Sequence, residues 1–284
     1  MVEKYSPHSL NEALDILASK DVYIVAGGSD LMVQKKNTAG LLPKFDKDVL
    51  FLAHVEELKK VYEDEEGVHI GAGVHLSDLE HNKLVPDLLR KCIGEVASVN
   101  VRHFATLAGN IANASPAGDT IVADVLLDAM VVLRSKNGIR KVKAEDFVLG
   151  VRKIDRHKDE LISELIFPKP KCDIYEWHKV GSRKADSISK LSFAGGYSIK
   201  DNKVTDFACA FGSVYIKAIR SHELEREIIG LSLDELSKKK DVLLGKYSKV
   251  ISPIDDQRSN KEYRQLVSMN ILAEFLDEII KGGK

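Results

Sequence analysis

The alternation of apolar and polar positions divides the 284-residue chain into short strands and amphipathic helices. Residues 9–19 predict a helix, because apolar residues recur every three or four positions and Ser9 with Glu12 forms a capping box. The β-branched run 22–25 follows directly and predicts a buried strand. Further apolar runs predict strands at 49–53, 68–70, 130–134, 139–143 and 161–167.

Turn and cap residues place several other elements of the first half. Asn137-Gly138 predicts a hairpin between two of the strands above. Ser77, with Glu80 three residues later, predicts the start of a short helix. Pro86 opens the next helix, and Cys92 lies on its apolar face.

The last third of the chain predicts strands followed by helices. A strand is expected near 174–178, and Asp201-Asn202 predicts a hairpin between strands at 193–199 and 204–211. Helices follow at 221–229, 232–244 and 259–280, the second with a capping box from Ser232 and Glu235. The expected buried stripe of the last helix is Leu266, Met269, Leu272, Leu276 and Ile279.

The stretch 22–32 combines a strand with small and polar residues. Gly27-Gly28 ends the strand, and Ser29-Asp30 opens a short helical pattern. Two glycines between a strand and a helix suggest a phosphate cradle built from backbone N–H groups. An ordinary tight turn also fits this stretch when it is taken alone.

A second stretch of this kind runs from 101 to 123. Residues 107–111 are expected to form a turn that a ligand can approach closely, and Ser115 is expected to cap a helix that begins at Pro116. A small-residue turn before a helix start is a natural site for an anion or a polar ligand. An ordinary turn again fits when the stretch is taken alone.

Composition narrows the function classes. Lys and Arg number 42 and Asp and Glu 43, so the net charge of −1 argues against a nucleic-acid footprint over the whole surface. The hydrophobic content of 44% allows a substantial core. Because no apolar run reaches membrane-spanning length and the first residues do not resemble a signal peptide, we expect a cytoplasmic protein.

The residue arrangements that support catalysis in other proteins are missing from this sequence. Its three cysteines, Cys92, Cys172 and Cys209, are far apart and too few to hold an iron–sulfur cluster, and Cys92 and Cys209 are expected in the core. His69, His75 and His81 share no helix face and are expected to be unconnected surface or loop residues. No phosphate-loop or nucleophile-elbow motif is present, so we assign no catalytic residue and no metal ligand.

Together the two small-residue stretches resemble a known family. AGGSDL at 26–31 is similar to the AGGTDL signature, and TLAGNIANASPAGD at 106–119 is similar to TxGGNIxxxSPxxD. These are the FAD-contacting loops of the flavin subunit of molybdenum hydroxylases, the xanthine dehydrogenase and carbon monoxide dehydrogenase medium-chain family. The resemblance continues at 70–79, 179–192 and 255–264. Ser29 replaces the usual Thr, and Ala108 replaces the first Gly of GGN.

The resemblance implies an α+β fold in two domains. It implies a two-part FAD-binding domain of the PCMH type at 1–168, with subdomains at about 1–58 and 59–168. A smaller α/β C-terminal domain, with an antiparallel sheet and helices, is expected at 172–284. The proline-punctuated segment 168–172 is the expected boundary.

The resemblance also implies the residues that contact FAD. The first loop would wrap the pyrophosphate, and the second would pass under the flavin and its ribityl chain. Asp119 would accept hydrogen bonds from cofactor hydroxyls, although it could instead be a first-turn charge favoured by the helix dipole. Leu161 or Ile162 would border the ring or be plain core residues, and Lys179 would lie near the pyrimidine edge or on the surface. The full set is Val25, Ala26, Gly27, Gly28, Ser29, Asp30, Leu31, Met32, Thr106, Leu107, Ala108, Gly109, Asn110, Ser115, Asp119, Leu161, Ile162 and Lys179.

For function, the resemblance implies an oxidoreductase subunit that transfers electrons. Two [2Fe–2S] clusters in a small partner subunit would supply electrons from a molybdenum-cofactor large subunit, in a dimer of heterotrimers. FAD in this chain would pass them to an external acceptor, with NAD a candidate. Two alternatives stay open: a self-contained FAD-dependent oxidoreductase of the same fold, and a scaffold that has lost its flavin. Ala108, in place of the usual Gly, is the one feature that favours the scaffold.

Overall fold

A computed structural model describes residues 2–282. By its internal contacts the chain forms two compact units. Unit 1 comprises Met1–Val85, Ala97–Ala114 and Asp128–Lys169, and unit 2 comprises Pro86–Val96, Ser115–Leu127 and Pro170–Lys284. The break at 169/170 falls within the proline-punctuated segment. Two segments of the first half nevertheless belong to unit 2, which differs from the contiguous division expected from the sequence.

Unit 1 opens with a small parallel sheet. Its order is β1-β3-β2, from strands Lys4–Tyr5, Val49–Phe51 and Tyr23–Val25. Helix α1 (Leu10–Ser19) connects β1 to β2 and buries Ala13, Leu14 and Leu17 against Leu50 and Leu52. Because the strands are parallel, the carboxyl end of β2 leads the chain into the glycine turn at an edge where ligands commonly bind.

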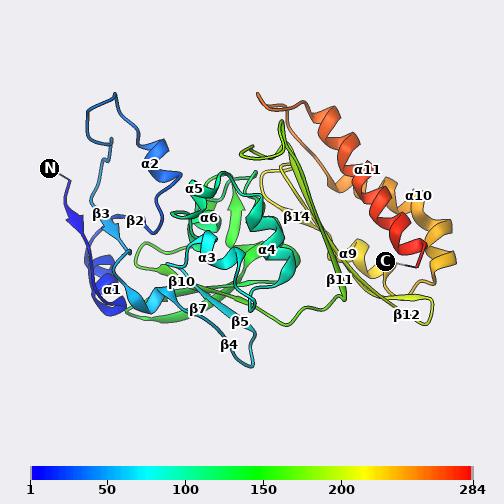
Figure 1. The fold of residues 1–284 in the computed structure, drawn as a ribbon, viewed down its shortest axis with the longest axis horizontal. Helices are drawn as coiled ribbons and strands as arrows, with labels where there is room; N and C mark the ends of the chain where they lie inside the picture. The colour runs from blue at the N-terminus through cyan, green and yellow to red at the C-terminus, as the bar shows by residue number, and fades with distance from the viewer. Residues whose placement is uncertain (1, 283–284) are drawn as a thin grey trace. The chain divides into compact units, whose positions relative to one another are not determined.

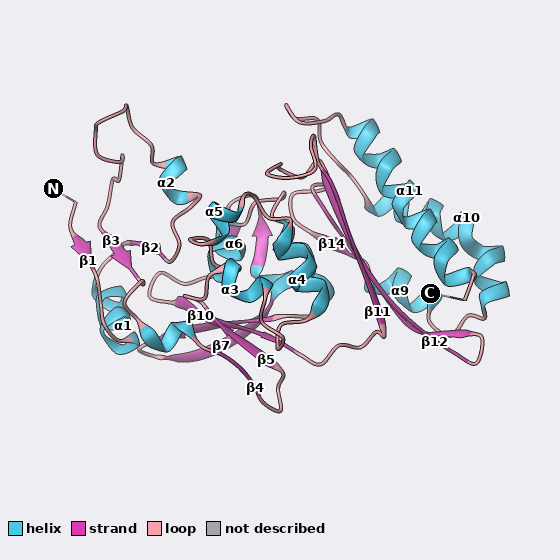
Figure 2. Ribbon diagram, viewed as in Figure 1, coloured by secondary structure: helices cyan, strands magenta, loops and turns pink. Residues whose placement is uncertain are grey.

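The second sheet of unit 1 is antiparallel and has the order β4-β5-β10-β6-β7 (Figure 2). Its strands are Val61–Glu63, Val68–Gly71, Leu161–Phe167, Met130–Ser135 and Gly138–Lys143. The predicted hairpin through Asn137-Gly138 is confirmed. Unit 1 also contains the short pair β8 (Val148–Gly150) and β9 (Lys153–Ile154) and the helical turns α2 (Leu31–Gln34), η1 (Glu56–Lys59), α3 (Leu76–Glu80), α5 (Val99–Arg102), α6 (Leu107–Asn113) and α8 (Ala144–Phe147).

Unit 2 is a four-stranded antiparallel sheet between two helical layers. The sheet runs β11-β12-β13-β14, from strands Ile174–Val180, Leu191–Lys200, Lys203–Gly212 and Ile219–Arg220. The hairpin through Asp201-Asn202 is confirmed. Helices α10 and α11 lie side by side against one face, to which α9 also packs (Figure 1). The helices are α4 (Asp87–Gly94), α7 (Asp119–Leu126), α9 (His222–Ile228), α10 (Leu233–Val250) and α11 (Lys261–Ile280).

The side-chain alternation of β12 and β13 explains the two layers of unit 2. Phe193 and Phe211 pair across the strands and pack edge-on among the aromatic rings around Phe275 of α11. The next residues point to the opposite face, where a Cβ on Gly212 would lie 2.6 Å from Val122 of α7. The small side at Gly212 therefore lets α7 pack directly on the sheet.

The stretch 107–119 corrects two sequence predictions. Residues 107–111 form the first turns of α6 and not an open turn, because the Thr106 hydroxyl caps the helix by accepting from the Gly109 N–H at 3.0 Å. Ser115 does not cap a helix. Residues 115–118 close a turn, and α7 begins at Asp119 after Gly118. The chain cannot continue as a helix between them, because Ala114 adopts a left-handed conformation with φ +46°.

Of the other local predictions, some are confirmed and some are wrong. The capping box of Ser232 and Glu235 is confirmed, and so is the burial of Cys92 and Cys209. The N-cap position of α3 is His75 and not Ser77, and its side chain makes no capping bond. Ser9 caps α1 as predicted by accepting from the Glu12 N–H, but the Glu12 carboxylate accepts from the His8 N–H and not from Ser9. Leu266 is 60% exposed and lies outside the buried stripe.

His69 was expected on the surface or in a loop, and that prediction is wrong. It is buried, contacts Asp64 and Glu164, and stacks on Tyr62. Both ring nitrogens have a polar partner, which explains how β5 accommodates a buried imidazole. The spacing of the histidines in the sequence did not indicate this burial.

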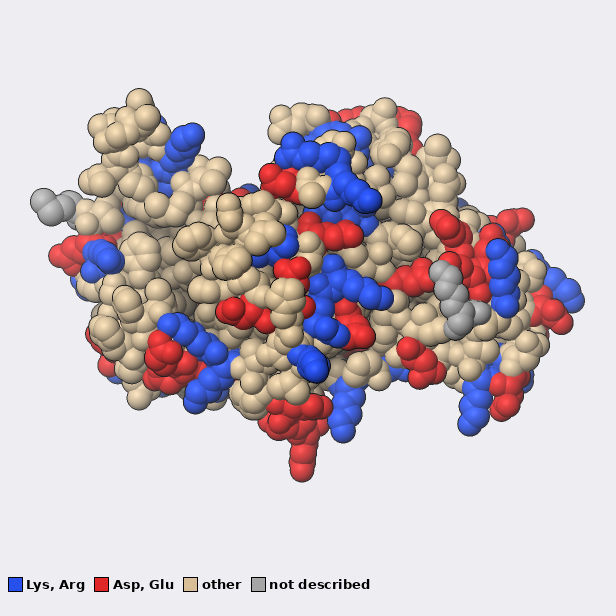
Figure 3. All heavy atoms as spheres, viewed as in Figure 1, with Lys and Arg blue, Asp and Glu red and all other residues tan. Residues whose placement is uncertain are grey.

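Charged side chains of both signs are mixed over the visible face (Figure 3). One acidic group on that face protrudes at the tip of the β4–β5 hairpin, whose connecting turn contains Asp64, Glu65 and Glu66. No helix within residues 2–282 is both long and apolar enough to cross a membrane.

One buried carboxyl group in α7 is unusual. Asp124 is fully buried, and within the described chain neither of its oxygens has a hydrogen-bond partner. Burial raises the pKa of Asp124 well above its usual range. The buried thiol of Cys92 lies near it on α4 and has its own pKa raised by burial.

The pKa of Asp124 predicts a pH dependence of stability. The folded state holds a proton that the unfolded state releases near pH 4, so the free energy of unfolding should fall as the pH rises above about 4. Asp124→Asn should remove that part of the slope. Chemical denaturation of wild type and variant between pH 4 and 8 measures it. Asp173→Asn, at an exposed position of unit 2, is the control. Parallel slopes in Asp124→Asn and wild type would contradict the prediction.

Candidate cofactor-binding site

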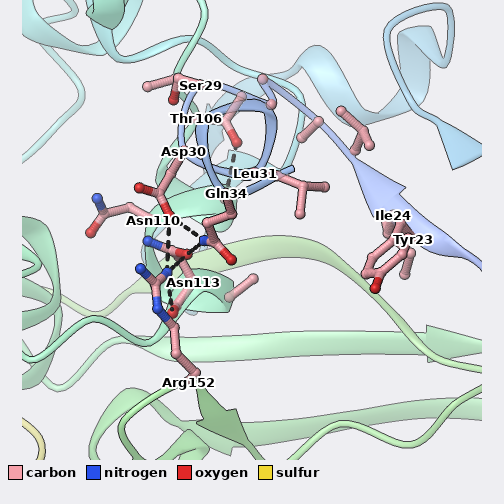
Figure 4. A pocket seen from close by; sticks show the side chains of 17 residues that line it. Tyr23, Ile24, Ser29, Asp30, Leu31, Gln34, Thr106, Asn110, Asn113 and Arg152 are labelled. Atoms are coloured by element: carbon pink, nitrogen blue, oxygen red, sulfur yellow. Dashed lines mark hydrogen bonds and ion pairs between the residues drawn. The ribbon is translucent and has the colours of Figure 1, made fainter. Parts of the chain in front are cut away.

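A cavity of about 310 Å³ lies in unit 1 at the carboxyl end of β2 (Figure 4). One wall is the loop from β2 into α2, and the other is the N-terminal turn and exposed face of α6. Arg152, from the turn between β8 and β9, closes one end. The lining residues are Tyr23, Ile24, Val25, Ala26, Gly27, Gly28, Ser29, Asp30, Leu31, Gln34, Ala105, Thr106, Gly109, Asn110, Ala112, Asn113 and Arg152.

Gly27 is required because the two walls meet through their backbones. A Cβ on Gly27 would lie 1.8 Å from the carbonyl oxygen of Phe104 and 3.0 Å from the Cα of Ala105. Gly28 is required for a different reason, since its φ of +69° lies in the left-handed region. The double glycine therefore brings the two predicted loops together and turns the chain into α2.

The first wall offers backbone donors. In the described chain the N–H groups of Gly28, Ser29 and Asp30 donate to no carbonyl or side chain, as expected for the residues that lead into a helix. The Gly28 carbonyl accepts from the Met32 N–H at 2.9 Å, which fixes the turn. Successive free N–H groups in such a turn form a concavity that suits a phosphate group.

The second wall explains the departure at Ala108. Thr106 caps α6, and Ala108 lies in the interior of that helix with a helical backbone and a buried side chain. The methyl group points away from the cavity, because Ala108 does not line it, whereas Gly109 and Asn110 do. Ala108 therefore leaves the cavity unobstructed.

The closed end of the cavity is a polar cluster of four side chains. The Arg152 Nη1 donates to Asp30 Oδ2 at 2.9 Å, to the Asn113 carbonyl at 3.2 Å and to the Asn113 side-chain oxygen. The Gln34 amide donates to the same Asp30 oxygen and to Asn113 Oδ1 at 3.1 Å (Figure 4). This cluster joins the loop, α2, α6 and the β8–β9 turn.

Sequence reasoning missed Gln34, Asn113 and Arg152. Arg152 lies 122 residues from Asp30, and its left-handed backbone, with φ +57°, is not visible in the sequence. Asn113 lies within the second predicted stretch but is not among the predicted site residues. The one available signal was Gly150, which marks a turn two residues before Arg152.

The predicted site residues fall into three groups. Val25, Ala26, Gly27, Gly28, Ser29, Asp30, Leu31, Thr106, Gly109 and Asn110 line the cavity. Met32, Leu107 and Ala108 are part of its walls without lining it, and Leu161 and Ile162 are buried on β10. Ser115, Asp119 and Lys179 belong to unit 2.

In unit 2, Asp119 and Lys179 form a buried ion pair. The Lys179 Nζ lies 2.7 Å from Asp119 Oδ2 and donates to the Glu95 carbonyl at 2.6 Å. The Ser189 hydroxyl donates to Asp119 Oδ1 at 2.5 Å. Asp119 is 6% exposed, and burial raises its pKa although Lys179 and Ser189 oppose the shift. Sequence reasoning treated Asp119 and Lys179 separately, whereas the structure joins them.

Leu161 packs with α1 and β3 residues in the hydrophobic cluster of the parallel sheet. Ile162, the next residue on β10, points to the other face and is 7% exposed. The three thiols are buried, and burial raises the pKa of each, that of Cys172 to about 12. Residues 2–282 contain no group of His, Cys, Asp and Glu side chains suited to a metal ion.

The fold and the cavity define a protein that binds a phosphate-bearing cofactor beside a glycine turn. Comparison with known proteins specifies the cofactor. Residues 1–170 match the family model of the FAD binding domain in molybdopterin dehydrogenase, and residues 176–279 match the CO dehydrogenase flavoprotein C-terminal domain.

Relatives and solved structures agree with these matches. The chain is 33% identical over 277 residues to the glyceraldehyde dehydrogenase medium chain of Sulfolobus acidocaldarius, covering 95% of each chain. It is 31% identical over 210 residues to the nicotinate dehydrogenase FAD-subunit of Eubacterium barkeri, covering 70% of this chain and 68% of that one. Its fold matches quinoline 2-oxidoreductase from Pseudomonas putida 86 with a TM-score of 0.85 at 22% identity, covering 99% and 98% of the two chains.

The chain therefore belongs to the FAD-binding medium subunits of the molybdopterin dehydrogenases, the xanthine and CO dehydrogenase family. It is an oxidoreductase subunit with an FAD-binding domain and a C-terminal domain built on an antiparallel sheet. The family and the α+β fold expected from the sequence are confirmed.

Gly27 gives a first test of the cavity. Gly27→Ala should destabilise the protein by about 1–3 kcal/mol and lower FAD affinity, because the added methyl group forces the two walls apart. Gly245→Ala is the control: it lies inside α10 with open space around its Cβ position and should be stabilising by about 0.5–1 kcal/mol. Denaturant unfolding and flavin titration measure both, and a Gly27→Ala protein that matches wild type would refute the close approach.

The ion pair gives a second test. Asp119→Ala leaves Lys179 buried without its partner, so the free energy of unfolding should fall by about 3–5 kcal/mol. The double variant Asp119→Leu with Lys179→Met should regain most of that loss, since an apolar pair of similar volume avoids the isolated charge. Equal stability of Asp119→Ala and wild type would show that the pair does not contribute to folding.

Proposed function

We propose that this chain is the electron-transfer subunit of a molybdenum hydroxylase. In this proposal it takes electrons from [2Fe–2S] clusters of a partner subunit and passes them to an external acceptor. The observation that carries the proposal is the glycine-lined cavity of unit 1 in a chain that belongs to the FAD-binding medium subunits.

The cavity fits the diphosphate end of FAD. Its free N–H groups can donate to phosphate oxygens, and the Ser29 hydroxyl adds a further donor beside them. The absent side chain at Gly27 lets the two walls of the cavity meet through their backbones. When bound, FAD supplies the redox chemistry, and the protein binds and orients it.

The other residues predicted to contact FAD each have a role in this proposal. Thr106, Gly109 and Asn110 would lie along the ribityl chain, and Leu161 or Ile162 would border the flavin. The contacts that the family resemblance implies for Asp119 and Lys179 of unit 2 would use oxygens and protons not engaged in their own pair. A carboxylate accepts as many as about four hydrogen bonds, so its two partners leave Asp119 capacity for a cofactor hydroxyl.

Among residues 2–282 we find no group that would oxidise an organic substrate by itself. Its three thiols are buried and have raised pKa values, and the described residues contain no metal-binding group. We infer that the substrate site and the clusters lie in partner subunits, in a dimer of heterotrimers. The relatives named medium chain and FAD-subunit support this arrangement.

The test uses the purified chain loaded with FAD. We expect a flavin spectrum whose chromophore stays in the supernatant after acid precipitation, since neither loop contains a His or Cys that could bind flavin covalently. Dithionite should bleach the flavin, whereas purines, aldehydes, carbon monoxide and aromatic heterocycles should not. Adding the iron–sulfur and molybdenum subunits should restore reduction by the correct substrate.

Two outcomes would contradict the proposal. Failure of the chain to bind FAD would make it a scaffold. Anaerobic bleaching by an organic substrate with this chain alone would instead favour a self-contained oxidoreductase.

A further inference from the structure

Asp30 occupies a position where a carboxylate usually stabilises a helix. It is the N-cap of α2, and an Asp at an N-cap normally accepts from the free N–H groups of the first turn. Here the side chain makes no such bond. One of its oxygens instead accepts from Arg152 and from Gln34.

This displacement affects the proposed cofactor site directly. Asp30 lines the same wall as the free N–H groups of the loop, those of Gly28, Ser29 and Asp30 itself, which would hold a diphosphate. A free carboxylate at Asp30 would compete for these donors and would also repel the phosphate charge. A cavity with an acidic residue in its phosphate-binding wall therefore needs a group that neutralises the acid and holds it aside.

Arg152 meets both requirements. It is the one basic residue among those lining the cavity. Its guanidinium forms an ion pair with Asp30 at 2.9 Å, and the Asn113 carbonyl and side chain orient the same nitrogen. Its backbone is fixed too, since its N–H donates to the Ala114 carbonyl at 3.0 Å and its φ of +57° is uncommon for a side chain of this size.

We propose that Arg152 is a positioning residue for FAD: it pairs with Asp30, neutralises that carboxylate and holds it aside, and so leaves the N–H groups of the β2–α2 loop free for the diphosphate. This inference rests on the proposed FAD-binding function. Gln34 supports the same arrangement through its bond to Asp30. The strained backbone at Arg152 has a role here, because it aims the guanidinium back at the loop.

The test is a double-mutant cycle on FAD binding to the chain, read by quenching of flavin fluorescence. Arg152→Ala should weaken FAD binding roughly tenfold at low ionic strength, the lower end expected for a charge-assisted hydrogen bond. Both side chains are about half exposed, 45% for Arg152 and 49% for Asp30, so the loss should shrink in high salt. Adding Asp30→Ala to Arg152→Ala should restore most of the affinity, because the competing carboxylate is gone.

Fragments of the cofactor locate the effect. Arg152→Ala should weaken binding of ADP, measured by competition with FAD, and leave binding of riboflavin unchanged. Arg152→Lys should lie between wild type and Arg152→Ala, because it keeps the charge and loses the fork geometry. Lys141→Ala, which breaks an exposed ion pair with Glu66 on another part of unit 1, is the control and should bind FAD like wild type.

The outcomes separate this inference from the proposed function. Wild-type protein that does not bind FAD would remove the proposed function itself. If wild type binds FAD, the inference is overturned by unchanged affinity in Arg152→Ala, by a loss that Asp30→Ala does not restore, or by an equal loss for riboflavin. A merely structural Arg152 would produce the second of these results together with a lowered melting temperature.

Discussion

The close approach of the Gly27 backbone to the Phe104 carbonyl is the constraint on which the proposed cofactor site of unit 1 depends. Two loops almost eighty residues apart in sequence meet there with no side chain between them. Because the contact is made by backbone, a single methyl group would separate the walls, whereas side chains further along can vary. The contact also explains why the glycine pair follows a parallel strand. The carboxyl end of β2 directs the loop at its partner, and the left-handed Gly28 then turns the chain into α2.

In unit 2 two buried polar residues are stabilised by an ion pair and not by a backbone contact. Asp119 begins α7, Lys179 lies near the end of β11, and both are buried, so each charge needs the other. The second acidic residue of α7, Asp124, has no such partner, and burial raises its pKa so that the neutral form is favoured. The same helix therefore carries one carboxyl group stabilised by an ion pair and one tolerated only in its neutral form. The ion pair fixes the position of the Asp119 carboxyl group, whereas the packing around the helix fixes that of Asp124.

Local sequence signals were sufficient where a structure depends on neighbouring residues. The Asn137-Gly138 hairpin, the Ser232 capping box and the strand that ends at Val25 before the glycine pair are examples. They were misinterpreted at residues 107–111, where the cause is local, and they were insufficient where a distant residue decides. Residues 107–111 are helical because Thr106 caps them and because Ala114 ends the helix, and Ser115 then lies in a turn. Arg152 and the Asp119–Lys179 pair were not predictable, since nothing local to a residue announces a partner sixty or more positions away. The placement of FAD-contacting residues by family resemblance stays a prediction, although most of the two loops do line one cavity.

The two ion pairs discussed here differ in burial, and that difference suits different tasks. The Asp119–Lys179 pair is almost fully buried, so breaking it exposes an uncompensated charge to an apolar interior and costs folding energy. The Asp30–Arg152 pair is half exposed, and pairs of that kind contribute little to stability. A half-exposed pair can still control binding, because it decides whether a carboxylate stands among the N–H donors that an anion needs. Stability alone would give no reason to keep an arginine in a left-handed conformation at this end of the cavity. Its position is explained if its task is to order the cavity for an anionic ligand, which we propose to be the diphosphate of FAD.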